Sequence, residues 1–374
     1  MTRLLILSHP SDAHFAAIDW ALRQANVFPV LLCGNDYPRH QTQTVSINNE
    51  SALKYKIYPQ FSKTILLDQF STIWYRRHIS PVIGSELHRS DRMAAFKEAE
   101  TTIDGIYTCL SDSVKWVNHP NHQRIASKKI YQLNVAKKIG LSIPKTLISN
   151  EYDDIRKFFI ATKDVIYKPQ NFMSWFESDT LAYLPYATRL SWEDIMGGEG
   201  VCSTANVFQE YIEKSFELRV LYLGGKINAY RLDTQNVEKA KTDWRSCVKG
   251  ELIPEQYKLS NTIKTKIDSL MRELKLFFGV LDFVVDRNGT IYFLEVNPSG
   301  QFLFLESWNP ELDILSKFCL FISENLDLTE KQKNILKKIK YVDFLNQESE
   351  IEKYKLLSEA FAPPLESGNI YWEG

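Results

Sequence analysis

The first part of the chain alternates short apolar runs with amphipathic stretches. The run RLLILS predicts a strand, AAIDWALRQA predicts a helix, and FPVLLC predicts a second strand. This order is typical of a small α/β unit. Further on, residues 93–109 have the spacing of a helix, whereas residues 116–123, WVNHPNHQ, are rich in Asn, His and Pro and predict a loop at a domain boundary.

The middle of the chain predicts a helix, a turn and a strand. Gly140 stands where a C-terminal helix cap is expected, and Pro144 leads into a strand. The apolar positions near helical spacing before that cap are Ile130, Leu133, Ala136 and Ile139. VIYKPQ, residues 165–170, predicts another strand. Residues 171–204 combine aromatic residues, Asp179 and the glycine-rich MGGEG at 196–200, which indicates a mobile hairpin or lid.

Two hairpins are predicted after this segment. Residues 207–234 alternate between apolar and polar positions, and Gly224 and Gly225 supply a turn between two strands. A helix is expected over residues 262–277, and residues 279–298 form a second hairpin with its turn at 286–289.

The last fifty residues, from Leu326, are charged and have a largely helical pattern, with a Pro-Pro break at Pro363. This tail is expected to pack as a helical cap or to mediate dimerisation.

Composition narrows the class of protein. A chain of 374 residues predicts two or three lobes, and a net charge of −1 gives no support to a nucleic-acid or membrane partner. The LLIL run near the start is too short for a signal peptide, and no apolar run approaches bilayer length. The five cysteines include no C-x-x-C pair, which argues against a disulfide framework and a zinc site. We therefore expect a cytoplasmic protein.

Candidate chemistry begins in the second hairpin. Asp282 and Glu295 lie in its two strands, and pairing about the turn can bring their carboxylates together on one face. Two close carboxylates in an apolar frame are costly unless a cation lies between them. Asn297 shares the face of Glu295 by strand alternation, and three oxygen ligands suit Mg²⁺ when phosphates complete its shell. The alternative is that all three are exposed polar residues without an ion.

Two lysines and two arginines complete the candidates. Lys129 and Lys168 each lie on a predicted rigid element that can aim an ammonium group at phosphate, although each also fits a surface lysine. Arg76 and Arg77, in STIWYRRHIS, are adjacent, a pattern that indicates solvated surface.

In chain order, the segments SKKIYQLNVAKKIGLSIPKT, VIYKP, FQEYIEKSFELRV, INAYRL, VLDFVV and FLEVNPSGQ resemble the ATP-grasp superfamily over residues 118–306. The resemblance implies an α/β (α+β) chain with the ATP-grasp fold. Its expected parts are an N-terminal pre-ATP-grasp α/β domain (1–118), a central subdomain with a lid (119–206), a C-terminal antiparallel-sheet subdomain with the magnesium and catalytic residues (207–325), and a helical extension (326–374).

The same resemblance implies roles for individual residues. Lys129 and Lys168 match lysines that contact the phosphates of ATP, and the loop at 196–200 matches the flexible loop over the triphosphate. Arg219 and Arg231 match arginines that bind phosphate and the developing acyl phosphate. The implied adenine contacts are Gln209, Glu210 and Ile212, the ribose contact is Glu213 or Glu217, and the Mg²⁺ ligands are Asp282, Glu295 and Asn297.

A narrower resemblance involves IWYRRHISP, VNHPNHQRIASKK, KTDWRSCV and LEVNPSGQFLFLE. These segments are similar to the microviridin-type graspetide ligases, including the grasp-with-spasm peptide maturases. The resemblance implies a homodimer that binds the leader of a precursor peptide, activates Asp or Glu side chains of its acidic core with ATP, and joins them to Ser, Thr or Lys. Arg245 would then join the catalytic arginines, whereas its DWR segment alone also fits a surface turn. Residues 172–199 and 233–254 are candidates for the leader-binding surface.

Two other functions fit the sequence less well. An amino-acid ligase resembling glutathione synthetase or the tail-glutamylating enzymes needs a pocket for a free amino acid, which no motif identifies. A non-catalytic nucleotide-binding protein has no need to retain the lysines, the metal ligands and the arginines together.

Overall fold

The computed structural model describes residues 3–50, 53–59, 63–77, 80–110, 114–170, 175–178, 181–183, 187–198 and 200–361, with the backbone alone at 175–178 and 181–183. The chain forms two compact units. The first contains the residues up to Arg124, Leu276–Phe278 and the described residues from Pro298 onward; the second contains Ile125–Lys275 and Gly279–Asn297. No helix in the described part of the chain is long and apolar enough to cross a bilayer.

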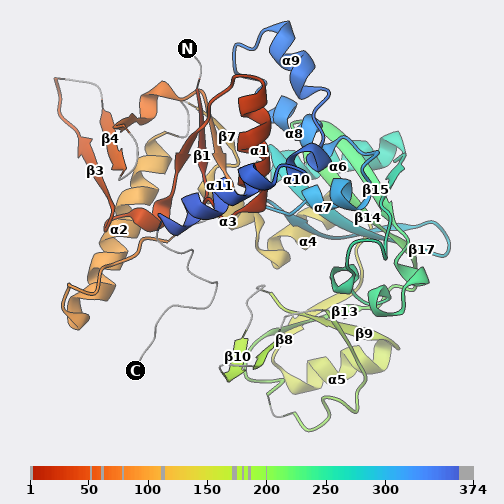
Figure 1. Ribbon diagram of the computed structural model, residues 1–374. Helices are drawn as coiled ribbons and strands as arrows, with labels where there is room; N and C mark the ends of the chain where they lie inside the picture. Colours follow the sequence, from red (N-terminus) through yellow and green to blue (C-terminus); the bar gives the residue numbers. More distant parts are fainter. Residues whose placement is uncertain are drawn as a thin grey trace. The chain divides into compact units, whose positions relative to one another are not determined.

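A parallel sheet organises the first unit (Figure 1). Its strand order is β2 (Val30–Leu32), β1 (Leu4–Leu7), β6 (Thr72–Tyr75) and β7 (Lys115–Val117). Every residue of β1 is buried, as expected for a strand covered on both faces. Helix α1 (Ala13–Gln24) follows β1 and is capped by Asp12, and α2 (Arg89–Cys109) precedes β7. The strand, helix and strand predicted for the N-terminus and the helix predicted over 93–109 are confirmed.

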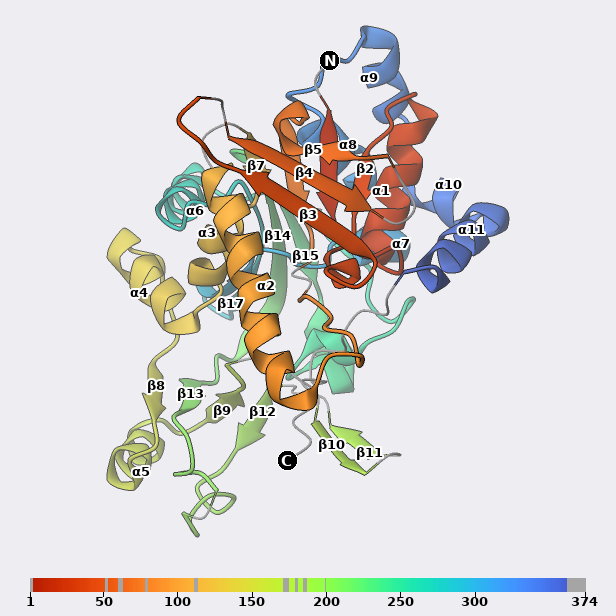
Figure 2. The same cartoon turned by 90° about the vertical axis from the view of Figure 1, so that its left-hand side faces the viewer.

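An antiparallel sheet also belongs to the first unit. It consists of β3 (Gln41–Ser46), β4 (Lys54–Pro59) and β5 (Ile65–Leu66), and Figure 2 shows β3 and β4 side by side. Tyr55, Ile57 and Ile65 share a hydrophobic cluster with Leu5 and Leu7 of β1. The short 3₁₀ helix η1 (Gly34–Asp36) lies between β2 and β3, and η2 (Leu67–Gln69) lies between β5 and β6.

The helices that follow the second hairpin return to the first unit. They are α7 (Leu303–Trp308), α8 (Ile314–Ile322), α9 (Glu330–Leu336), α10 (Tyr341–Leu345) and α11 (Glu348–Glu359). Helix α1 contacts α8, α9, α10 and α11. Trp20 packs on Phe344, with ring centroids 5.6 Å apart, and the Tyr354 hydroxyl donates to Asp19 Oδ2 at 2.6 Å. The described tail therefore caps α1, and its predicted helical character is confirmed; Pro363 lies outside the described residues.

The unit division differs from the boundary expected at residue 325, because Pro298 and the residues after it group with the N-terminal unit. Aromatic packing accounts for the difference. The Phe318 ring lies 5.0 Å from Trp74 of β6, and the Phe302 ring lies 4.7 Å from His14 of α1. These contacts between distant segments have no signal in the local sequence pattern.

The second unit contains two antiparallel sheets. The smaller has the order β12 (Thr188–Leu190), β9 (Val165–Lys168), β13 (Asn206–Glu210) and β8 (Thr146–Ser149), with α5 (Tyr152–Ala161) packed on β8. The strand predicted at 165–170 is β9. A hairpin of β10 (Trp175–Ser178) and β11 (Leu181–Tyr183) lies in the segment expected to be a lid. Asp179, Glu199 and parts of 171–186 lie outside the described residues.

The larger sheet carries both predicted hairpins. Its order is β16 (Glu255–Tyr257), β15 (Lys226–Leu232), β14 (Lys214–Leu223), β17 (Phe278–Asp286) and β18 (Ile291–Asn297). Gly225, with φ +96°, turns the first hairpin, and Gly289, with φ +83°, turns the second; both angles favour glycine. Helices α4 (Lys129–Ile139) and α6 (Asn261–Glu273) contact one another, and α4 contacts β18. Both hairpins and both helices confirm the predictions.

The prediction of a loop over residues 116–123 is wrong. Trp116 and Val117 belong to β7 and are buried, and α3 (Pro120–Ala126) begins directly afterwards. Proline fits the first helical position because its missing N–H has no partner within the helix there. The Asn, His and Pro residues therefore mark a strand end and a helix start.

The prediction of solvated arginines is wrong for Arg76, which is fully buried, whereas the side chain of Arg77 is 45% exposed. Both guanidinium groups donate to Asp12, the capping residue of α1. Proximity to a carboxylate from a distant segment is invisible in the local sequence.

Candidate active site

A β-bulge in the β17–β18 hairpin places the two predicted carboxylates next to each other on one face of the sheet. Phe283 pairs with Phe293, but Asp282 pairs with Glu295, so Leu294 is the extra residue. Continued regular pairing would place Leu294 opposite Asp282 and turn Glu295 to the other face of the sheet. The predicted proximity of Asp282 and Glu295 is confirmed, and the bulge is its cause. Asn297 is two residues beyond Glu295 and pairs with Val280.

Each carboxylate also has a cationic partner. Arg219, on the neighbouring strand β14, donates through Nη1 to both oxygens of Asp282 at 2.6 Å. The Lys129 ammonium, at the start of α4, donates to Glu295 Oε2. Burial and the charge of Glu295 raise the pKa of Asp282, although Arg219 opposes this shift. Burial acts in the same sense on Glu295, but Lys129 and Lys168 outweigh it and lower the pKa of that carboxyl.

Lys168 ends β9 and contributes another positive charge to this cluster. Its burial lowers its pKa to about 8, while Glu295 raises the value and Lys129 lowers it further. Next to it lies a buried ion pair that sequence reasoning missed, in which Lys214 Nζ donates to Glu217 Oε1 at 2.6 Å. Glu217, expected at the ribose, is thus tied to Lys214, and burial raises its pKa. The sequence carried no signal for the pair, because residues three apart in a regular strand point to opposite faces.

The DWR segment forms a turn with a defined partner for Arg245. It is the 3₁₀ helix η5 (Trp244–Ser246), which follows η3 (Thr234–Asn236) and η4 (Glu238–Ala240). Asp243 accepts from Arg245 Nε at 2.8 Å and from Nη2 at 2.5 Å, and its Oδ2 accepts from the Ala187 N–H at 3.4 Å. The charges of Glu295 and Asp282 also raise the pKa of Arg245. The Arg219 guanidinium lies 5.4 Å from the Trp244 ring centroid.

The donor set fits a magnesium ion bound with a nucleotide. Asp282 and Glu295 offer carboxylate oxygens on one face, and like charges so placed favour a cation between them. In the described part of the chain, no group of three or more His, Cys, Asp or Glu side chains forms a metal site. Two carboxylates and the Asn297 amide leave ligand positions for phosphate oxygens, which is how Mg²⁺ is usually bound.

The predicted adenine and ribose contacts lie along β13 and just after it. The Gln209 amide is buried and donates to Thr146 Oγ1 at 2.9 Å, while Glu210 Oε2 accepts from the Lys145 N–H at 3.3 Å. Ile212 is half-buried. Glu213 is exposed, and its Oε2 lies 3.6 Å from Arg287 Nη2. The structure thus places these residues in one segment, and their contacts with a nucleotide remain predictions.

Arg231 does not share the sheet face of Arg219. In the β14–β15 register Arg219 pairs with Tyr230 and Leu218 pairs with Arg231, so the two arginines alternate onto opposite faces. Arg231 instead donates to Asp233 at 2.7 Å and lies 4.1 Å from the Phe216 ring centroid. Its catalytic role remains a prediction from the resemblance.

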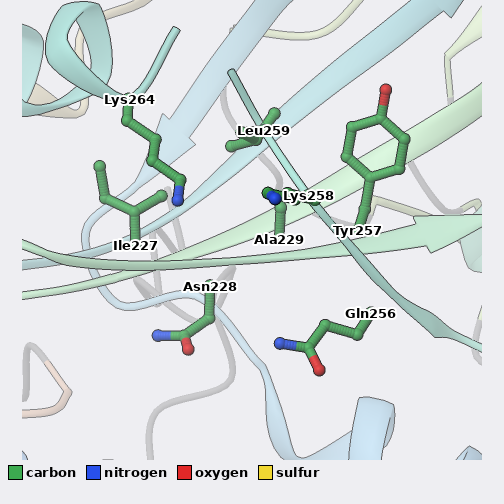
Figure 3. Close-up of a pocket in the computed structure, with 8 residues that line it drawn as sticks. All are labelled: Ile227, Asn228, Ala229, Gln256, Tyr257, Lys258, Leu259 and Lys264. Carbon is green, nitrogen blue, oxygen red and sulfur yellow. The ribbon is translucent and has the colours of Figure 1, made fainter. Parts of the chain in front are cut away.

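A hollow of about 400 Å³ lies along β15 and β16 of the same sheet, and its lining includes residues of both sheet faces (Figure 3). Figure 3 shows Lys264, Ile227, Ala229 and Tyr257 around it, and Ala229 pairs with Tyr257 in the sheet. Its described lining includes none of the predicted site residues. This hollow is therefore separate from the predicted site residues.

Sequence comparison with known proteins gives a family match in the N-terminal lobe. Residues 3–124 match the family model of the MvdD pre-ATP grasp domain. No curated protein matches the chain in a sequence search.

Three solved structures are similar over nearly their whole length. A RiPP-associated ATP-grasp ligase of Chryseobacterium gregarium, in complex with ADP and a leader and core peptide, has a TM-score of 0.77 and 24% identity over 88% of this chain and 98% of its own. The macrocyclase MdnC of Microcystis aeruginosa MRC, bound with its precursor peptide MdnA, has a TM-score of 0.73 and 22% identity over 87% of this chain and 100% of its own. The ATP-grasp ligase PsnB, complexed with a phosphomimetic variant of a minimal precursor, Mg and ADP, has a TM-score of 0.65 and 19% identity over 87% of this chain and 98% of its own. The chain therefore has the predicted α/β ATP-grasp ligase fold, and its N-terminal lobe matches the MvdD pre-ATP grasp domain.

Proposed function

We propose that this protein is an ATP- and Mg²⁺-dependent ligase that crosslinks a ribosomally made precursor peptide. In this reaction a side-chain carboxylate of the peptide's acidic core takes the γ-phosphoryl group of ATP, which releases ADP and forms an acyl phosphate. A Ser or Thr hydroxyl, or a Lys amine, attacks the acyl carbon, phosphate leaves, and the nucleophile loses its proton. Each ω-ester or ω-amide bond thus removes one water from the peptide.

The observation that carries the proposal is the pairing of Asp282 with Glu295 inside a cluster of cations. Lys129 and Arg219 contact these carboxylates directly, and the charges of Lys168 and Arg245 act on Glu295. Such a cluster offers oxygen ligands to Mg²⁺ and positive charge to phosphate on one face of a sheet. Phosphoryl transfer depends on positioning and electrostatic stabilisation more than on a side-chain nucleophile.

The chain's own residues divide the work. Lys129 and Lys168 bind and orient the phosphates of ATP, and the segment from Gln209 to Glu217 receives the nucleoside. Arg219 and Arg245 stabilise negative charge on the transferred phosphoryl group and orient the substrate carboxylate. Asp282, Glu295 and Asn297 would hold Mg²⁺, which supplies charge neutralisation between the phosphates when bound.

The partner follows from the similar structures. The ligases of similar fold were solved with a leader and core peptide, with MdnA, or with a minimal precursor, and we infer that a precursor peptide with a leader and an acidic core is also the substrate here. A microviridin-type product, a homodimer and a cytoplasmic location complete the proposal.

Intact mass spectrometry tests the proposal. The full chain is incubated with ATP, Mg²⁺ and the acidic, Ser/Thr-containing peptide encoded nearest its gene, and we expect the loss of one water per crosslink. The Glu295→Gln variant is the matched negative control, because the change keeps size and removes charge. An unchanged peptide mass, together with ADP release stimulated by free amino acids, would favour an amino-acid ligase instead.

A further inference from the structure

A buried asparagine of the N-terminal unit uses all its hydrogen-bonding groups on two distant segments. Asn118 directly follows β7 and is 1% exposed. Its Oδ1 accepts from the N–H groups of Phe277 at 2.8 Å and Phe278 at 3.0 Å, and its Nδ2 donates to the carbonyls of Phe278 at 2.9 Å and Pro298 at 3.1 Å. Two accepted and two donated bonds complete the capacity of an amide side chain.

These partners are the open ends of the hairpin that carries the carboxylates. Phe278 is the first residue of β17, and Pro298 directly follows Asn297, the last residue of β18. Pairing between the two strands begins at Val280 with Asn297. The Asn118 amide therefore bonds the backbone just beyond the last pair, where strand pairing has stopped.

Two further buried side chains hold the residues after Pro298. Arg76 Nη1 donates to the Ser299 carbonyl and, at 3.5 Å, to that of Gly300. His14 Nε2 accepts from the Phe302 N–H at 3.0 Å and from the Leu303 N–H at 3.3 Å. These contacts require the neutral imidazole with its proton on Nδ1, because an accepting nitrogen carries none.

Asp12 fixes the orientation of Arg76. Its Oδ1 accepts from Arg76 Nε at 3.2 Å and also from the N–H groups of His14 and Phe15 at the start of α1. A buried guanidinium with one anchored edge can present its other nitrogens only in fixed directions. Thus α1 and the residues directly after β6 and β7 each contribute a side chain that bonds residues 277–278 or 298–303.

We propose that Asn118, Arg76 and His14 form a hairpin clamp, a set of positioning residues that fix the open ends of β17 and β18 and so set the spacing of Asp282, Glu295 and Asn297 for Mg²⁺. The inference rests on the magnesium site of the proposed function. It explains why polar residues of the YRR and VNHP segments are buried, since their partners are the backbone groups on either side of the metal-binding strands. Residues that orient metal ligands commonly change metal affinity when replaced.

The test measures Mg²⁺ binding separately from turnover. ADP binding to the full chain is followed by calorimetry across a Mg²⁺ titration for the wild type, Asn118→Asp and Asn288→Asp. Asn118→Asp keeps the shape of the side chain but loses both donated bonds, and we expect it to raise the Mg²⁺ concentration for half-maximal binding about tenfold. Affinity for ADP without Mg²⁺ should stay within about twofold, because a purely positional change leaves the lysines intact.

Asn288→Asp is the matched control, since Asn288 is exposed at the closed end of the same hairpin and receives the same change of charge. An equal Mg²⁺ shift in this control, or an unchanged Mg²⁺ requirement in Asn118→Asp, overturns the proposal. If Asn118→Asp does not fold, Arg76→Lys decides instead: it keeps the charge beside Asp12, and we expect about a threefold shift in Mg²⁺ requirement. An unchanged requirement there overturns the clamp.

The two proposals can fail separately. A wild type that binds ADP with Mg²⁺ but leaves the peptide mass unchanged contradicts the crosslinking function and leaves the clamp test readable. If the affinity of the wild type for ADP does not depend on Mg²⁺, both the clamp and the metal site are overturned.

Discussion

In the described part of the chain, two buried arginines each pair with an aspartate, and the two pairs differ in what surrounds that aspartate. Arg76, 0% exposed, pairs with Asp12 in the first unit, and Arg219, 6% exposed, pairs with Asp282 in the second. Asp12 also accepts two backbone N–H groups and a second guanidinium, that of Arg77. Asp282 faces a second carboxylate, Glu295.

The pKa shifts follow this difference. Burial alone would raise the pKa of Asp12, but the charges of Arg76 and Arg77 and the hydrogen bond from the Phe15 N–H outweigh it and hold the value well below its ordinary range. Burial and Glu295 instead raise the pKa of Asp282. The anion of Asp12 is thus compensated and stabilises the fold, whereas Asp282 lies beside a second carboxylate, whose own charge Lys129 and Lys168 stabilise. A carboxyl group whose pKa is shifted by burial and by a neighbouring charge is typical of functional sites.

The largest expected effect comes from removing a charge at the second site. We expect Glu295→Gln to lower the rate of peptide modification by about a thousandfold or more, because the variant loses a metal ligand and the partner of Lys129. Its melting temperature should also fall, since Lys129 and Lys168 lower the pKa of Glu295 and so stabilise its anion in the folded state. Steady-state mass spectrometry and thermal unfolding measure both. Glu255→Gln, at an exposed position of β16, is the control, and equal activity in the two variants would contradict the assignment.

Asp12→Asn should act mainly on folding stability. Removing the Asp12 carboxylate leaves Arg76 buried without an anionic partner, and we expect the free energy of unfolding to fall by about 3 kcal/mol. Asp282→Asn should change the same quantity by less than about 1 kcal/mol, because the lost ion pair is offset by the relieved repulsion from Glu295. Urea denaturation of both variants gives the comparison. Equal destabilisation would show that the two aspartates have the same structural role.

Arg245→Ala separates binding from chemistry at the second site. The proposed role at the acyl phosphate predicts about a hundredfold loss of peptide modification with ADP affinity nearly unchanged. Asp243→Asn should reproduce part of this loss, about tenfold, because Asp243 holds the guanidinium of Arg245. Calorimetry with ADP and rates from mass spectrometry provide the two readings. A loss of ADP affinity equal to that of Lys168→Ala would instead place Arg245 among the nucleotide contacts.

Asp12 and Asp282 should change the acid dependence of folding stability in opposite directions. A carboxyl with a lowered pKa in the folded state contributes stability above its unfolded pKa of about 3.9, and this contribution is lost as the pH falls through the lower folded value. Asp12→Asn should therefore reduce the loss in free energy of unfolding below about pH 5 by about 1–2 kcal/mol. The decline in melting temperature over this range should be correspondingly flatter. Asp282→Asn should steepen that decline, since the folded state with a raised pKa gains a proton more readily. Identical pH profiles would contradict the distinction.

Local patterns predicted the elements of this site, and distant contacts decided their relation. The turn glycines Gly225 and Gly289 identified both hairpins, because a positive φ has a strong residue preference. The bulge at Leu294 had no such signal, yet it alone places Glu295 on the face of Asp282. Arg76 looked like a surface residue because its partners lie some 65 and more than 220 residues away in the chain. Sequence reasoning therefore supplied the ligand types, while strand register and unit packing supplied their geometry.

The smallest expected effect tests that register directly. Arg219 and Arg231 were predicted together as catalytic arginines, but β14–β15 pairing places them on opposite sheet faces. If side-chain direction follows the register, Arg231→Ala changes peptide modification by less than about threefold, whereas Arg219→Ala costs about a hundredfold. Both substitutions remove a guanidinium that lies near an aromatic ring, Phe216 or Trp244, so they form a matched pair. An equal loss in the two variants would mean that Arg231 leaves Asp233 and reaches around the strand end to the substrate, and the site would then extend beyond the Asp282 face.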